Sequence, residues 1–161
     1  MSLNVNNLPF EIIEKIFEEL GKENMIDLMS NISIVCKTWN TIFNKCIFKK
    51  IKYLKFDYLM SLTDVKVKSI VNKCPGITHV NFCGCWNLTD AAVIALADKC
   101  PGITHVNFGS CQNMTDVALI ALADKCPGIT HAEFWSCEKL TYAAVSALAD
   151  KCPGITHAEF I

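Results

Sequence analysis

The stretch Cys100-Pro-Gly-Ile-Thr-His-Val-Asn-Phe108 decides the fold, because close copies of it recur every 26 residues. Residues 74–99 and 100–125 are identical at 20 of 26 positions, and residues 100–125 and 126–151 at 16 of 26. Such self-similarity predicts a solenoid, in which short units stack in one direction and share a continuous core. The copies open at Cys74, Cys100, Cys126 and Cys152.

Each copy is predicted to form one strand and one helix. Val106 and Phe108 alternate with polar residues at the period of a strand, and both should face the core. Thr115 is placed to cap the following helix, and Asp116 puts negative charge in its first turn. The next Cys-Pro-Gly ends that helix. The helix residues expected to face the core are Leu119, Leu122 and Ala123.

The repeat extends to both sides of the three clear copies. Residues 48–73 hold a divergent copy in which Thr63-Asp64 takes the place of Thr89-Asp90. Residues 152–161 supply a strand without a helix, so an unpaired outer edge is expected there. All the strands must run parallel, because every unit repeats the same course of the chain.

Composition narrows the class of protein. The 161 residues are 52% hydrophobic with a net charge of −1, so neither nucleic acid nor a membrane surface is an expected partner. The N-terminus lacks the charged and apolar regions of a signal peptide, and no stretch reaches the ~18 apolar residues of a membrane helix. Seven of the ten cysteines recur in register, which indicates buried free thiols and a cytoplasmic or nuclear location.

Residues 1–47 differ in pattern from the repeat. Leu8, Ile12, Ile16 and Leu20 form one stripe of an amphipathic helix, with Pro9 in its first turn. Two further helical stretches follow, one through Met25–Met29 and one over about 34–43. Periodicity alone favours a three-helix cap on the open end of the solenoid.

The residues themselves favour another interpretation. The run Leu8-Pro-x-Glu-Ile-Ile-x-x-Ile-Phe-x-x-Leu20, followed by Leu28 and then Val35-Cys-Lys-x-Trp39, resembles the F-box motif. That resemblance implies binding to the Skp adaptor of a cullin-type ubiquitin ligase. The residues that match the motif's adaptor-facing or core positions are Leu8, Pro9, Ile12, Ile16, Leu20, Leu28, Val35, Cys36 and Trp39.

The repeats resemble the cysteine-containing leucine-rich repeats found behind F-boxes, with Ile, Val, Ala or Phe at the leucine positions. The expected fold is α/β: a three-helix F-box, then a short leucine-rich-repeat solenoid with parallel strands on its concave face and helices on its convex face. In such repeats Cys85, Cys111 and Cys137 lie inside the turn after the strand. The predicted domains are the F-box at 1–47 and the array at 48–161, divided into 48–73, 74–99, 100–125, 126–151 and a partial 152–161.

Recognition is expected on the outward strand positions. All four histidines fall in one column there, with neighbours ~4.8 Å apart, which should lower their pKa. The column is either inherited by duplication and merely solvated, or contacts a ligand, or binds metal adventitiously. The target-binding residues predicted on the concave face are Tyr53, His79, Asn81, His105, Asn107, His131, Glu133, Trp135, His157 and Glu159.

Two features of the repeat have competing interpretations. Trp135 occupies the position that Cys83 and Gly109 hold in the two preceding copies. It is either an exposed anchor for a partner or a ring packed on Ile161. The cysteine ladder could suggest zinc, but equivalent positions diverge along a line and do not converge tetrahedrally, so no metal or cofactor is expected.

Two functions fit these patterns, and a third does not. The first is a ligase subunit that binds the adaptor and presents a target protein for ubiquitin-dependent degradation, monomeric outside the complex. The second is an interaction module that sequesters the adaptor without delivering a target. An enzyme has no support, because the sequence shows no phosphate-binding glycine loop and no nucleophile with an assigned base.

Overall fold

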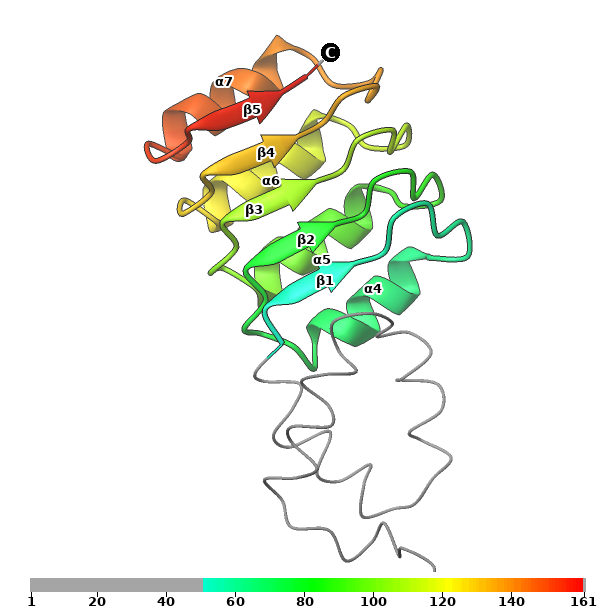
Figure 1. Ribbon diagram of the computed structural model, residues 1–161. Coiled ribbons are helices and arrows are strands. Elements are labelled where there is room, and N and C mark those ends of the chain that lie inside the picture. Colours follow the sequence, from blue (N-terminus) through cyan, green and yellow to red (C-terminus); the bar gives the residue numbers. More distant parts are fainter. Residues whose placement is uncertain (1–50, 161) are drawn as a thin grey trace, which may run out of the picture. The chain divides into compact units, whose positions relative to one another are not determined.

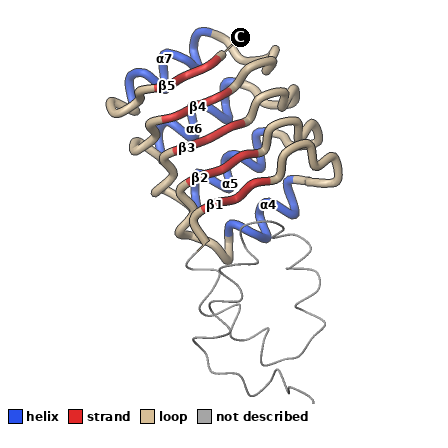
Figure 2. The backbone as a smooth tube through the Cα atoms, viewed as in Figure 1, coloured by secondary structure: helices blue, strands red, loops and turns tan. Residues whose placement is uncertain are grey.

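A computed structural model describes residues 51–160. The chain divides into two compact units, residues 1–50 and 51–161, and the described residues belong to the second. They form a five-stranded parallel sheet whose strands follow chain order, with a helix between each pair of strands (Figure 1). The helices lie together on one side of the sheet (Figure 2). The predicted α/β solenoid is therefore confirmed for this unit.

The elements repeat with the 26-residue period seen in the sequence. The strands are β1 (Tyr53–Lys55), β2 (His79–Asn81), β3 (His105–Asn107), β4 (His131–Glu133) and β5 (His157–Glu159). The helices are α4 (Asp64–Val71), α5 (Asp90–Lys99), α6 (Asp116–Lys125) and α7 (Tyr142–Lys151).

Local chemistry sets the bounds of each helix. In α6 the Thr115 hydroxyl accepts a hydrogen bond from the Val117 N–H at 3.3 Å, and Thr89 and Thr141 cap α5 and α7 in the same way. At the other end the Cys126 N–H donates to the Leu122 carbonyl before Pro127 stops the helix. The predicted caps are thus present.

The core lies between the sheet and the helices. Val106, Phe108, Leu119 and Leu122 are all buried, as their spacing predicted. Phenylalanine rings contact one another from repeat to repeat with centroids 5.6–5.8 Å apart, from Phe56 through Phe82, Phe108 and Phe134 to Phe160. Three of these pairs are stacked, and Phe82 meets Phe108 edge to face. No helix among the described residues is long and apolar enough to cross a membrane.

Candidate interaction surface

The side of the sheet away from the helices is called here the strand face. Register brings three columns of side chains onto it, because each strand pairs with the next at an offset of 26 residues. The columns contain Tyr53, His79, His105, His131 and His157; then Lys55, Asn81, Asn107, Glu133 and Glu159; then Asp57, Cys83, Gly109 and Trp135.

The histidine column is a continuous stack of rings. The centroids of His79 and His105 are 4.1 Å apart and those of His105 and His131 are 4.3 Å apart, with interplanar angles of 13° and 9°. At the two ends the rings are tilted: Tyr53 lies 4.4 Å from His79 at 33°, and His157 lies 5.8 Å from His131 at 34°. The predicted histidine column is therefore present, and the rings of His79, His105 and His131 lie face to face in it.

A threonine hydroxyl holds each of three imidazoles in place. Thr104 Oγ1 lies 3.2 Å from the Thr78 carbonyl oxygen and 2.8 Å from Nδ1 of His105. One hydrogen bond joins the hydroxyl to Nδ1, and the tautomer of the ring decides which of the two atoms donates. The same pair of contacts recurs at Thr78–His79 and Thr130–His131.

Burial, together with neighbouring histidines, lowers the pKa of two histidines. For His79 the first cause is burial and the second is the nearby His131. For His105 it is burial, then its neighbours His79 and His131. The expected fall in pKa is confirmed for these two residues. Among residues 51–160 no cluster of three His, Cys, Asp or Glu could hold a metal ion.

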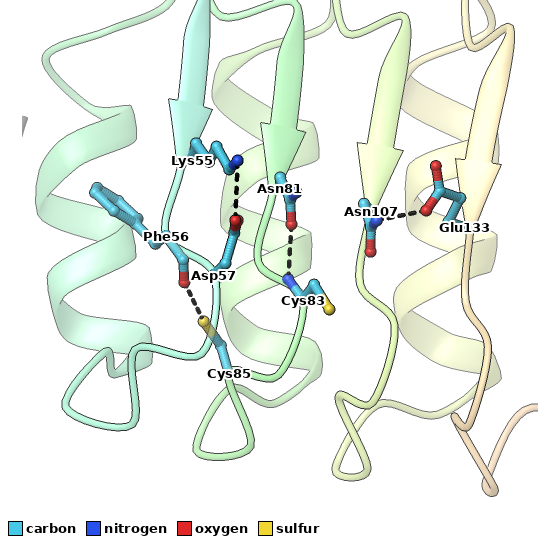
Figure 3. Close-up of polar contacts among 8 residues, drawn as sticks. All are labelled: Lys55, Phe56, Asp57, Asn81, Cys83, Cys85, Asn107 and Glu133. Atoms are coloured by element: carbon cyan, nitrogen blue, oxygen red, sulfur yellow. Dashed lines mark hydrogen bonds and ion pairs between the residues drawn. The ribbon is translucent and has the colours of Figure 1, made fainter. Parts of the chain in front are cut away.

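The second column changes character along the array (Figure 3). At β1, Lys55 forms an ion pair with Asp57 at 3.1 Å. At β2 and β3, Asn81 and Asn107 each accept a hydrogen bond at Oδ1 from the backbone N–H two residues later, at 3.0 Å. Asn107 then donates from Nδ2 to Oε2 of Glu133 on β4. The amide is held by its own strand and orients the carboxylate of the next strand.

Aromatic rings cover the third column. A Cβ atom built on Gly109 would lie 2.3 Å from the Trp135 ring, and one on Gly84 would lie 2.4 Å from the Tyr58 ring. Trp135 therefore packs on the preceding repeat, whereas Ile161, the other contact considered for it, lies outside the described residues. Cys83 lies in this column but is only 6% exposed, so it offers little free surface for recognition. Tyr58 explains this burial, since its ring lies against the adjacent Gly84.

The turn cysteines bind the backbone of the preceding repeat. Cys85 Sγ donates to the Phe56 carbonyl at 2.8 Å, and Cys111 and Cys137 repeat this contact with Phe82 and Phe108 (Figure 3). Burial raises the pKa of Cys85 to about 11 and, with the neighbouring cysteines, that of Cys111 to about 12. These thiols are structural donors, as their position inside the turn predicted.

One recurrent contact was missed at the sequence level. Asp90, in the first turn of α5, accepts hydrogen bonds from Thr115 of the next repeat: 2.7 Å from the backbone N–H and 2.7 Å from the hydroxyl. Asp64 binds Thr89 and Asp116 binds Thr141 in the same way. The sequence suggested only a role in helix capping, although the joint recurrence of Thr and Asp was visible. We call this contact the Asp–Thr bracket.

The predicted adaptor-binding residues, from Leu8 to Trp39, lie outside the described residues. The binding role of the strand-face residues stays a prediction, although ten predicted positions do lie on one face. Of these, Tyr53, His157 and Glu159 are exposed, and the others are half-buried.

Comparison with known protein families identifies one domain of the chain. Residues 5–51 match the F-box domain. No curated protein sequence matches the chain.

Solved structures show a related fold. A structure of the Rad7 and Elc1 complex in yeast has a TM-score of 0.60 at 21% identity, over 65% of this chain and 27% of the matched chain. The tropomodulin C-terminal domain of Caenorhabditis elegans has a TM-score of 0.55 at 11% identity, over 70% of this chain and 75% of that one. Residues 5–51 thus match an F-box domain, and the chain has a fold similar to parts of these two structures.

Proposed function

We propose that this chain is a substrate-recognition subunit of a Skp–cullin–F-box ubiquitin ligase. The F-box match at residues 5–51 carries the proposal, because that motif implies binding to a Skp-family adaptor. In this role the repeats, which we assign to the cysteine-containing leucine-rich class, bind a target protein on the strand face. The chain itself performs no bond chemistry and needs no cofactor.

The strand face supports the second half of the proposal. The strand residues that face the core are nearly constant from repeat to repeat. The second column of the strand face varies instead, in the order Lys55, Asn81, Asn107, Glu133, Glu159. A sheet face with polar side chains held by hydrogen bonds and one half-buried tryptophan suits a protein partner, since aromatic anchors with a polar surround are typical of interfaces.

The adaptor half is tested by pull-down of a purified Skp adaptor with the tagged full chain. Pro9→Ala and Trp39→Ala should each reduce the retained adaptor. Pro101→Ala and Trp86→Ala are matched controls, because both residues are exposed on the repeats, and they should retain it fully. If the unaltered chain retains no adaptor, the F-box role is wrong.

The target half is tested in cells by recovering ubiquitylated proteins with the full chain. Recovery should depend on both Trp39 and Trp135. If adaptor is retained but no ubiquitylated partner depends on Trp135, the alternative of an adaptor-sequestering protein replaces the receptor.

A further inference from the structure

The C-terminal end of the strand face carries carboxylates, which accept hydrogen bonds and bear negative charge. Glu133 lies on β4 and Glu159 on β5, both in the second column. A surface of this composition favours a partner that brings hydrogen-bond donors.

Two of the carboxylates are placed directly against each other. Glu133 and Glu159 are Cα partners on β4 and β5, and strands lie about 4.8 Å apart. Like charges directly opposite in a sheet are destabilising. Glu133 accepts from the Asn107 amide, and Oε1 of Glu159 lies 3.4 Å from Nε2 of His157. Neither carboxylate pairs with a lysine among the described residues, in contrast to Asp57, which pairs with Lys55. A cation between the two carboxylates would relieve their repulsion.

A tryptophan lies next to this pair. Trp135 follows Glu133 by two residues and is half-buried, with atoms of its ring against Gly109. Because Gly109 has no side chain, the ring can lie low on the sheet. An indole ring next to carboxylates is a favourable environment for a guanidinium or ammonium group, through combined cation–π and charge-assisted contacts.

We propose that the strand face binds a basic segment of the target protein, with an arginine or lysine side chain held by Glu133, Glu159 and Trp135. The proposal rests on the proposed function, since it names the chemistry of the target. The asparagine of β3 contributes by orienting Glu133, through its Nδ2 contact.

The test measures binding of the full chain to pools of labelled dodecapeptides that share one fixed central residue. The arginine and lysine pools should bind about tenfold more tightly than the citrulline and glutamate pools, and salt should weaken that binding. Glu133→Gln and Trp135→Leu should each remove most of the preference. Asp150→Asn makes the same charge change on α7 and should leave it intact.

A pair of glycine variants tests the ring position without changing the polar groups. Gly109→Ala would clash with the Trp135 ring and displace it, while a Cβ on Gly102 meets nothing within 4 Å. The arginine preference should therefore fall in Gly109→Ala and persist in Gly102→Ala. Equal binding by all four pools, a preference for glutamate, or equal losses in Glu133→Gln and Asp150→Asn would overturn the proposal.

Adaptor retention separates this inference from the proposed function. Glu133→Gln should retain the Skp adaptor fully. If adaptor is retained but basic pools are not preferred, only the inference on target chemistry is wrong. If basic pools bind but no adaptor is retained, the surface stands and the ligase role is wrong.

Discussion

Residues 126–134 and 152–160 have the same sequence, Cys-Pro-Gly-Ile-Thr-His-Ala-Glu-Phe, but different surroundings. In the first, Ala132 and Ile129 are fully buried and Phe134 is nearly so. In the second, Ala158 is exposed, and Ile155 and Phe160 are half-buried. The difference arises because β4 has neighbours on both sides, whereas β5 pairs only with β4 within the described residues. Burial in this array is therefore a property of the stack and not of the local sequence.

The largest difference in stability between the two copies should come from a charge placed at the same position of each copy. Ala132→Asp buries an unpaired carboxylate and should cost about 4 kcal/mol or more, or prevent folding. Ala158→Asp, at an exposed site, should cost less than about 0.5 kcal/mol. Urea unfolding followed by circular dichroism measures both. Similar costs in the two variants would contradict the stack as the source of burial.

The next largest effect should come from the phenylalanine column. Phe134 stacks on both Phe108 and Phe160, whereas Phe160 stacks only on Phe134. Phe134→Ala should lower the free energy of unfolding by about 3–5 kcal/mol, and Phe160→Ala by less than half as much. The urea midpoints of the two variants give the comparison directly, and a larger loss at Phe160 would refute it.

A smaller effect is expected at the Asp–Thr bracket. Asp90→Ala removes two charge-assisted hydrogen bonds to Thr115 and should cost about 1.5–3 kcal/mol. Tyr142 occupies the equivalent position of α7 and is 83% exposed, so Tyr142→Ala should change stability by less than about 0.5 kcal/mol. If the two variants unfold at the same urea concentration, the bracket contributes nothing to the stacking of repeats.

The smallest effect should be the pH dependence of the histidine stack. The pKa of His79 and of His105 is lowered in the folded array, so the unfolded chain binds protons more readily. Stability should thus be fully present above pH ~6.5, the unfolded pKa, and fall as pH drops below it. Urea midpoints at pH 7.5 and 5.5 should differ less in His105→Gln than in the unaltered chain. An unchanged difference would show that the stack does not carry the effect.

The sequence predicted those parts of the fold that depend on chemistry within one repeat. The strand phase, the threonine caps and the inward cysteines were all visible as 26-residue recurrences. The structure confirms them for the three clear copies, whereas Thr63 of the divergent copy makes no side-chain hydrogen bond to cap α4. The Asp–Thr bracket was not predicted, because periodicity shows that a position recurs without showing which atoms of the next repeat it meets.

The strand face was predicted less completely for a related reason. The alternation of polar and apolar residues along each strand predicted the columns correctly. It did not predict whether a large ring in a column would lie over the preceding or the following repeat. Trp135 turns to the preceding repeat because Gly109 leaves room there, and Cys83 is buried where Tyr58 packs beside it. Such contacts depend on the volumes of side chains from two repeats at once, which a pattern of polar and apolar positions does not record.

The cysteine ladder has a practical consequence for following the molecule in solution. With a pKa of about 12, Cys126 is almost entirely a thiol and not a thiolate at neutral pH, and alkylating reagents attack the thiolate. Labelling should therefore be slow while a repeat stays closed and fast once it opens. Because such buried cysteines recur along the array, each reports on the opening of its own repeat. The time course of alkylation, followed by mass spectrometry, could therefore map the order in which the repeats unfold.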